Sequence, residues 1–154
     1  DFGCGKGDML DFFNNHRVAA SYTGIDVNGK LLALARQKHG DGEFIRCDIE
    51  EQTLDRTFDV ILICGVFNLR IAGIAASLRT SLQRLFPLCR EALHLNIPST
   101  RTGAKDLDMY YADPGELLRF ALETLSPEVS LHHGLVENEI ILSVYNPRRR
   151  ASQA

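Results

Sequence analysis

The sequence has no long hydrophobic run. Nothing in its 154 residues approaches the roughly 18 consecutive apolar residues that a membrane-spanning helix needs, and no secretory signal is visible at its start. We therefore expect no membrane association. The length suits one domain, and the balance of 45% hydrophobic and 24% charged residues is that of an ordinary globular protein.

Neither sign of charge is in large excess. The formal net charge is only -3, whereas a nucleic-acid-binding domain usually shows net basic character. We therefore expect no nucleic-acid partner. The one basic cluster, Arg148-Arg149-Arg150, lies at the end of the chain, and we interpret residues 147–154 as a solvated basic tail that follows a domain over residues 1–146.

Cysteine is too sparse for a disulfide framework. The four cysteines are Cys4, Cys47, Cys64 and Cys89, and none of them forms a C-x-x-C pair. This pattern favours neither a metal site nor disulfides, so we expect no bound metal. It indicates reduced thiols in a cytoplasmic protein.

The hydrophobic periodicity alternates between strands and helices along the chain. Helices are expected over about 8–20, 28–39, 71–85 and 113–125, and strands over 22–27, 43–48, 58–65, 92–97, 128–135 and 139–145. This order predicts an α/β fold, a doubly wound and mostly parallel sheet whose last two strands form an antiparallel edge hairpin. Gly40-Asp41-Gly42 is expected to be a turn.

Two details of this pattern can be checked residue by residue. Asn28 is a plausible N-cap for the second helix, whose buried face should carry Leu31, Leu34 and Ala35. The run over 58–65 is almost continuously apolar, which is typical of a parallel strand covered on both faces.

The first seven residues, Asp1-Phe2-Gly3-Cys4-Gly5-Lys6-Gly7, carry the strongest functional signal. They read as the end of a buried strand followed by a glycine-rich turn that opens a helix, and such a turn lets the backbone approach a ligand closely. A dinucleotide fingerprint would need G-x-G-x-x-G/A, but the sixth position counted from Gly3 is Asp8, whose carboxylate would repel a pyrophosphate. No G-K-[ST] follows, which excludes a P-loop. The spacing therefore favours a ligand without phosphate.

Acidic residues end the next two expected strands. Asp26 lies 21 positions after Gly5, where a carboxylate can accept hydrogen bonds from both ribose hydroxyls, and Asp48 could accept one from an exocyclic amine such as that of adenine. The alternative for each acid is a residue that caps the following helix.

Taken in order, these segments resemble the class I S-adenosylmethionine-dependent methyltransferases. The resemblance rests on Asp1 to Gly7, on the strand Tyr22-Thr23-Gly24-Ile25-Asp26, on Phe44 to Ile49, and on Phe58 to Ile61 with Gly65 to Asn68. It implies a Rossmann-like fold and S-adenosylmethionine as the cofactor. The implied cofactor-binding residues are Asp1, Gly3, Cys4, Gly5, Asp26, Val27, Asp48, Ile49, Cys64 and Gly65.

Within this set, the resemblance assigns the methionine portion to Asp1 and the loop backbone, the ribose to Asp26, and the adenine to Val27, Asp48 and the Ile49 backbone. Cys64 and Gly65 would line the site near the sulfonium. Asn68 and Tyr111 are candidates for orienting a methyl acceptor. Members of this family usually have a helix and a full first strand before the glycine motif, so we expect an N-terminally truncated domain with a gapped sheet.

The functional hypothesis is methyl transfer from S-adenosylmethionine to a small-molecule acceptor that the sequence does not identify. One alternative keeps the fold without the chemistry, as a non-catalytic S-adenosylmethionine-binding or interaction module in a larger protein. A nicotinamide-dependent enzyme is a further alternative, which Asp8 disfavours. The oligomeric state is not predictable from these residues.

Overall fold

The computed structural model describes residues 1–40 and 42–147, which form two compact units. Unit 1 covers Asp1–Thr53 and unit 2 begins at Leu54. Asp41 of the predicted turn and the basic cluster of the predicted tail lie outside the described residues. None of the described helices is long and apolar enough to cross a membrane.

Unit 1 is built on two short parallel strands, β1 (Thr23–Asp26) and β2 (Glu43–Arg46). They pair in register from Thr23 opposite Glu43 to Asp26 opposite Arg46. The start of the chain adds to this ladder, because Phe2 forms a parallel bridge with Ile25. The glycine motif therefore begins beside β1, at the edge of the sheet where β1 ends.

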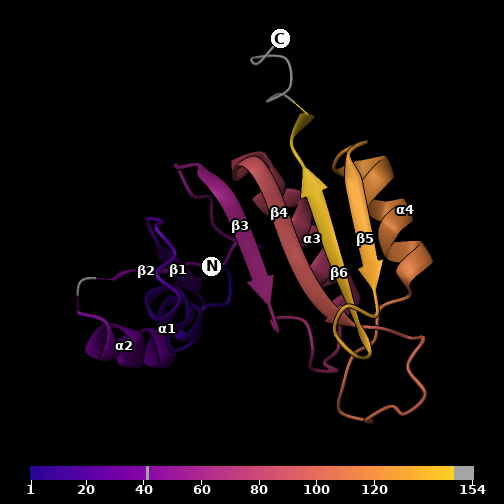
Figure 1. The fold of residues 1–154 in the computed structure, drawn as a ribbon, viewed down its shortest axis with the longest axis horizontal. Helices are drawn as coiled ribbons and strands as arrows, with labels where there is room; N and C mark the ends of the chain where they lie inside the picture. The colour runs from indigo at the N-terminus through magenta and orange to yellow at the C-terminus, as the bar shows by residue number, and fades with distance from the viewer. Residues whose placement is uncertain (41, 148–154) are drawn as a thin grey trace. The chain divides into compact units, whose positions relative to one another are not determined.

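Two helices accompany these strands, α1 (Asp8–Asn15) and α2 (Gly29–Lys38), and they lie side by side in Figure 1. The predicted cap of α2 is confirmed, since the Asn28 side chain accepts hydrogen bonds from the backbone N–H groups of Lys30 and Leu31. The predicted buried face is partly wrong: α2 buries Leu32 and Ala35, whereas Leu34 is 49% exposed.

The first helix ends at Asn15, several residues before the predicted end. Arg17 has a positive φ of 54°, a left-handed conformation that cannot continue a right-handed helix. The apolar spacing that suggested a longer helix therefore covers only its first two turns.

Unit 2 is a four-stranded sheet in the order β3-β4-β6-β5. Its strands are β3 (Phe58–Cys64), β4 (Cys89–Pro98), β5 (Val129–His133) and β6 (Glu139–Tyr145). The β3 and β4 strands are parallel, with Ile61 opposite Leu93, and β6 is antiparallel to both β4 and β5. The predicted antiparallel hairpin at the edge is therefore confirmed.

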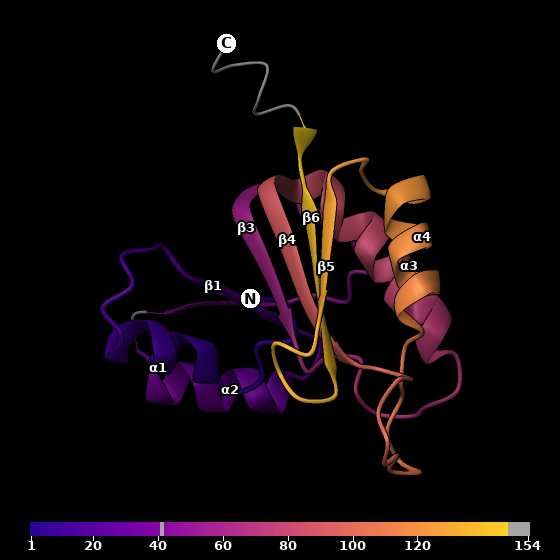
Figure 2. The ribbon, with the colours of Figure 1, turned by 45° about the vertical axis from the view of Figure 1, so that its right-hand side comes forward.

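Helices α3 (Ile74–Leu85) and α4 (Pro114–Thr124) cover one face of this sheet, as Figure 2 shows. A short 3-10 helix, η1 (Phe86–Leu88), joins α3 to β4. The sheet residues that are fully or almost fully buried alternate along the strands: Ile61, Ile63, Leu93, Leu95, Ile97, Ile140, Leu142 and Val144. This alternation marks a sheet with its core on one face.

The prediction that the strand over 58–65 is covered on both faces is wrong. Val60 is 44% exposed, and Cys64 is exposed at the end of β3. The reason is position, because β3 is the outer strand of its ladder and both helices of unit 2 cover a single face. An apolar run does not by itself distinguish an edge strand from a central one.

Candidate functional site

The glycine loop is fixed to the end of β1 by three backbone donors. The N–H groups of Gly3 and Cys4 both donate to the Ile25 carbonyl, at 2.7 and 3.0 Å. The N–H of Gly5 donates to Asp26 Oδ2 at 2.8 Å. These donors hold the loop in shape before any ligand arrives.

Asp26 joins the loop to the start of α2. Its Oδ2 accepts from Gly5 and its Oδ1 accepts from the backbone N–H of Asn28 at 2.7 Å, while the residue is only 9% exposed. A carboxylate oxygen has two lone pairs, so each oxygen can accept one more hydrogen bond. The position is consistent with both interpretations of Asp26, although the side chain that caps α2 is that of Asn28.

Two glycines of the loop face different surroundings. Gly5 has φ +54°, and no atom lies within 4 Å of the position that a Cβ would take. Gly7 has φ +81°, but a Cβ there would lie 3.0 Å from His39 Cδ2 and 3.2 Å from Phe44 Cζ. Gly5 therefore borders open space, whereas Gly7 is a close-packing position.

A hollow of about 410 Å³ opens beside the ends of β1 and β2. It is lined by Val27, Arg46, Asp48, Glu51 and Gln52. Val27 is 53% exposed, and the Asp48 backbone N–H donates to Gln52 Oε1 at 3.0 Å. Ligand pockets commonly measure about 300–1,000 Å³, so the hollow has room for part of a nucleoside.

Within this hollow the structure brings together Val27 and Asp48, which the sequence predicted, with three residues that it did not. Arg46, Glu51 and Gln52 were missed because a charged run after a strand also describes an ordinary solvated turn. The Arg46 Nε donates to the Val27 carbonyl at 3.2 Å, which fixes the edge of the hollow. Ile49 is 3% exposed, so its side chain belongs to the core.

Cys4 lies under the loop as a packing residue. It is buried in a cluster with Leu32, Ala35 and Phe44. Burial raises the pKa of its thiol to about 11, and the nearby charge of Asp26 adds to the effect. The thiol is therefore neutral at physiological pH and is not an activated nucleophile.

In unit 2, the turn after β3 is held by a short polar chain. The N–H of Gly65 donates to Asn96 Oδ1 at 2.9 Å, and Asn96 Nδ2 donates to Glu139 Oε2 at 2.7 Å. Cys64 precedes this turn and is exposed. Sequence reasoning missed Asn96 and Glu139, although the polar end of an otherwise apolar strand was a usable signal.

Beyond β3, residues 68–70 meet residues 108–110 through an isolated antiparallel bridge, and this short segment is here called the ribbon. Leu69 is bridged to Met109, the N–H of Tyr110 donates to the Asn68 carbonyl at 2.8 Å, and the N–H of Arg70 donates to the Asp108 carbonyl at 2.8 Å. The ribbon brings both predicted acceptor residues near one segment, because Tyr111 directly follows it.

The two predicted acceptor residues have different polar environments. Asn68 Oδ1 is buried without a hydrogen-bond partner among the described residues. The Tyr111 hydroxyl accepts from the Asp106 backbone N–H at 2.7 Å, which closes the loop before the ribbon. Its own hydrogen remains available as a donor.

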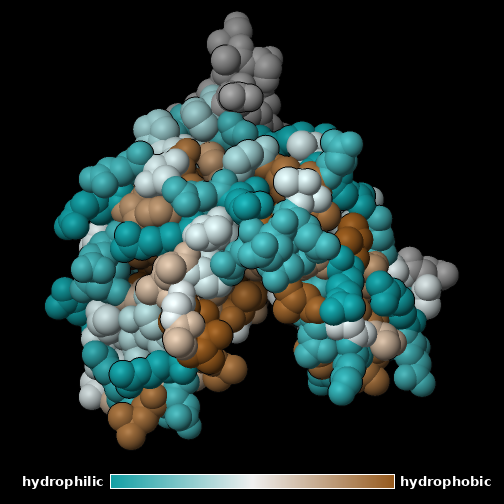
Figure 3. Space-filling view, turned by 180° about the vertical axis from the view of Figure 1, so that it is seen from behind, coloured by the Kyte–Doolittle hydropathy of each residue, from teal (hydrophilic) through white to brown (hydrophobic). Residues whose placement is uncertain are grey.

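Exposed apolar side chains lie at the ribbon and in the turns beside it. Leu69 belongs to the bridge, whereas Ile71 and Leu107 lie in adjacent turns, in which the Ile71 N–H donates to the Leu69 carbonyl and the Met109 N–H donates to the Asp106 carbonyl. Leu69, Ile71 and Leu107 are 63%, 62% and 82% exposed. On the face that Figure 3 shows, hydrophobic side chains gather in patches among hydrophilic ones.

The predicted residues thus form two groups. The residues from Asp1 to Ile49 belong to unit 1, and Cys64, Gly65, Asn68 and Tyr111 belong to unit 2. Among the residues that the structure describes, no group of His, Cys, Asp or Glu side chains could hold a metal ion.

Comparison with known proteins decides the family. The profile of a family described as a methyltransferase domain matches residues 1–87. A protein of Mycobacterium tuberculosis (strain ATCC 25618 / H37Rv) named as a methyltransferase, Rv1506c, is 30% identical over 153 residues, with 92% of this chain and 90% of the relative covered. The chain belongs to the methyltransferase family. This chain is also 34% identical over 61 residues to the trans-aconitate 2-methyltransferase of Escherichia coli (strain 55989 / EAEC). That match covers 40% of this chain and 24% of that protein.

Solved structures share the fold of this methyltransferase. Magnesium protoporphyrin IX methyltransferase (ChlM) from Synechocystis PCC 6803 with bound SAH has a TM-score of 0.72 at 16% identity, covering 95% of this chain and 72% of that one. The plantazolicin methyltransferase BpumL, in complex with a pentazolic desmethylPZN analogue and SAH, has a TM-score of 0.73 at 17% identity, covering 95% and 75%.

These findings confirm four predictions for the methyltransferase. They are the class I family, the Rossmann-like α/β fold with its antiparallel edge, the enzyme class, and S-adenosylmethionine as the methyl donor.

Proposed function

We propose that unit 1 holds S-adenosylmethionine along the end of β1 and that the enzyme methylates a small-molecule acceptor. One observation carries the proposal. The Asp26 carboxylate accepts from Gly5 and Asn28, and the next residue, Val27, lines the hollow together with Asp48. The glycine loop, the Asp26 carboxylate and the hollow thus all lie at the end of β1.

The groups present suit this donor. The Asp26 oxygens can each accept one ribose hydroxyl, because each is engaged by a single backbone donor. Asp48 lines the hollow and can accept the adenine amine, with the exposed Val27 side chain against the ring. The open space at Gly5 lets the methionine portion pass close to the backbone, with Asp1, Gly3 and Cys4 alongside.

Cys64 and Gly65 are proposed to contribute through the turn that Asn96 holds. That contribution is a separate part of the proposal, because these residues belong to unit 2. Its support is the positive φ of Gly65, 73°, which fixes a tight turn directly after β3.

The proposed acceptor is a small molecule with an apolar portion. Support comes from the exposed apolar side chains of Leu69, Ile71 and Leu107 at the ribbon, which follows β3 and β4 at the strand ends where open α/β sheets bind ligands. Asn68 and Tyr111 would orient the acceptor. The names of similar proteins mention trans-aconitate, magnesium protoporphyrin IX and a desmethylPZN analogue.

Bound S-adenosylmethionine supplies a methyl group activated by a sulfonium. The protein's part is to bring the acceptor atom into line with that methyl group, and proximity and alignment supply most of the rate enhancement in such displacements. We assign no general base. The four cysteines, all free in the structure, support a reducing cytoplasmic location within the same proposal.

Calorimetric titration tests the donor site. S-adenosylhomocysteine (SAH) and 5′-methylthioadenosine both carry the ribose, so Asp26→Ala should weaken both ligands by more than roughly tenfold, the loss expected for two charge-assisted hydrogen bonds. Asp8→Ala is the matched control, because the Asp8 carboxylate pairs with Lys38 and does not line the hollow. Affinities unchanged by Asp26→Ala would contradict the ribose assignment.

Transfer of label from methyl-labelled donor to a panel of small organic acids, phenols and peptides tests the second half of the proposal. Product formation on small apolar acceptors supports it. Methylation confined to nucleic acid or to intact proteins would contradict it, and donor binding without any transfer would favour a binding module.

A further inference from the structure

Tyr22 occupies a position in unit 1 that the proposed function does not use. Its hydroxyl donates to Asp1 Oδ2 at 2.6 Å. We propose that Tyr22 is a positioning residue for the methyl donor: it orients the Asp1 carboxylate toward the amino-acid portion of S-adenosylmethionine. The inference rests on the proposed function of unit 1 and adds a residue to it.

The Tyr22 ring is fixed from two elements. It makes edge-to-face contacts with Phe13 of α1, at a centroid distance of 6.1 Å, and with Phe44 of β2, at 6.0 Å. It also packs against the buried cluster that contains Cys4 and Leu32. A ring held on two sides directs its hydroxyl to one place, so the bond to Asp1 needs little further ordering.

The Asp1 main chain is fixed independently of its side chain. The N–H of Ile25 donates to the Asp1 carbonyl at 2.8 Å, which pairs this residue with β1. The Tyr22 hydroxyl adds a restraint on the carboxylate itself. A carboxylate offers about four acceptor positions, so Asp1 can accept from Tyr22 and still accept from a ligand ammonium.

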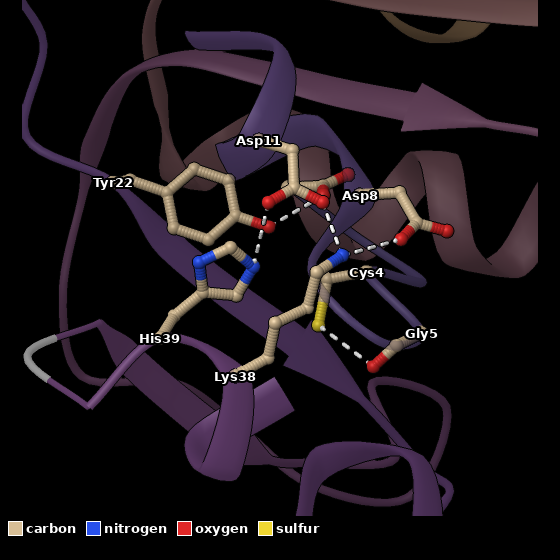
Figure 4. Close-up of polar contacts among 8 residues, drawn as sticks. Cys4, Gly5, Asp8, Asp11, Tyr22, Lys38 and His39 are labelled. Carbon is tan, nitrogen blue, oxygen red and sulfur yellow. Dashed lines mark hydrogen bonds and ion pairs between the residues drawn. The ribbon is translucent and has the colours of Figure 1, made fainter. Parts of the chain in front are cut away.

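The neighbouring polar groups make pairs of their own. Figure 4 shows Lys38 between Asp8 and Asp11, with His39 on the other side of Asp11. His39 Nε2 lies 3.4 Å from Asp11 Oδ1. Lys38 therefore engages both acidic side chains of α1, while the Tyr22 hydroxyl donates to Asp1.

The Tyr22 hydroxyl keeps its hydrogen and therefore remains a donor to Asp1. Burial, with the nearby charge of Asp8 adding to the effect, raises the pKa of the Tyr22 hydroxyl well above its usual range. The hydroxyl thus keeps its hydrogen at every pH at which the protein would be assayed. The effect of Tyr22 on ligand binding should be the same at pH 6 and pH 9.

Tyr22→Phe keeps the packed ring and removes only the hydroxyl. It should weaken SAH, which carries the amino-acid portion, by roughly tenfold, because a hydrogen bond that orients a charged group is worth on this order. It should leave 5′-methylthioadenosine, which lacks that portion, within about twofold. A role in folding alone would weaken both ligands together.

Thr23→Val is the matched control. It removes another hydroxyl-to-carboxylate bond of 2.6 Å, from Thr23 to Glu43, at the adjacent residue. It should change neither affinity. The unfolding midpoint of each variant, measured by circular dichroism, checks that the variants remain folded at the titration temperature.

A double-variant cycle completes the test. If Tyr22 acts through Asp1, Tyr22→Phe should have no further effect on SAH affinity in the Asp1→Ala background. Additive losses, or equal losses for both ligands, would overturn the inference and leave the proposed function intact. Failure of the unaltered protein to bind SAH would overturn both.

Discussion

Gly5 and Gly7 belong to one loop and share a left-handed backbone, but different atoms lie beyond them. An alanine Cβ at Gly5 would meet nothing within 4 Å, whereas one at Gly7 would lie 3.0 Å from the His39 ring. Both substitutions carry the strain of a positive φ, about 1–2 kcal/mol. Gly7→Ala adds the clash, so we expect it to lower the free energy of unfolding more, by about 1–3 kcal/mol in total.

The effects on ligand binding should be reversed. Gly5→Ala places a methyl group in the space proposed for the donor, so it should weaken SAH more than Gly7→Ala does. Chemical denaturation gives the stabilities, and calorimetry gives the affinities. A Gly5→Ala protein with normal SAH affinity would show that this space does not take the ligand.

At this scale, spacing predicted which residue types would stand at the strand ends. The 21-residue interval between Gly5 and Asp26 placed an acid beside the glycine loop, and the hydrogen bond between them fits that expectation. The spacing did not predict that Asp26 would also accept a hydrogen bond from the Asn28 N–H, or that the Tyr22 hydroxyl would donate to Asp1. Those contacts depend on the direction of single side chains, which no periodicity encodes.

The start of α4 provides a test at the scale of an element. Asp113 Oδ1 accepts from the backbone N–H groups of Glu116 and Gly115, at 3.1 and 2.9 Å. These bonds hold the pKa of Asp113 below its usual 3.8, and the bond from the Glu116 N–H has the largest effect. A carboxyl whose pKa is lower in the folded state stabilises the protein above the unfolded pKa.

We therefore expect Asp113→Ala to destabilise unit 2 at pH 7 and to matter less as the pH falls below about 3.8 and through the folded pKa. Asp113→Asn keeps a capping oxygen but removes the titrating carboxyl, so its effect should be smaller at pH 7 and should also fade toward low pH. Urea unfolding between pH 3 and pH 7, followed by circular dichroism, measures both differences. A penalty for Asp113→Ala that grows toward low pH would contradict this account.

The elements themselves were largely predictable, and their ends and surroundings were not. The cap Asn28 marked the start of α2 correctly, because capping is a local property of the chain. The early end of α1 and the exposure of Val60 were not readable, since one depends on the left-handed Arg17 and the other on which strands pair. Local signals report local structure, and burial is set by partners distant in sequence.

At the scale of the whole molecule, the described strands form two separate ladders, β1-β2 in unit 1 and β3-β4-β6-β5 in unit 2. The larger ladder has the larger apolar core, with residues such as Leu93, Leu142 and Val144 fully buried. Unit 1 ends at Thr53, and chains of about 60 residues bury only about 60% of their unfolded surface. Unit 1 should therefore be the less stable part.

Ligand binding should reveal this difference. A ligand that binds only the folded state stabilises it by about 2.7 kcal/mol at one hundred times its Kd. Because the proposed donor contacts lie mainly in unit 1, saturating SAH should slow hydrogen exchange at β1, β2 and α2 by up to about 100-fold. The amides of β4 and β6, which pair with each other over the larger core, should change much less.

Hydrogen–deuterium exchange followed by mass spectrometry resolves these segments, and Asp26→Ala is the control that should abolish the ligand-dependent protection. Equal protection of all six strands on adding SAH would mean that the two units open together. Protection confined to unit 2 would place the donor elsewhere than the end of β1. Slower exchange at β1 and β2 alone would instead show that the smaller unit gains its stability from the cofactor, as its thin core and open loop require.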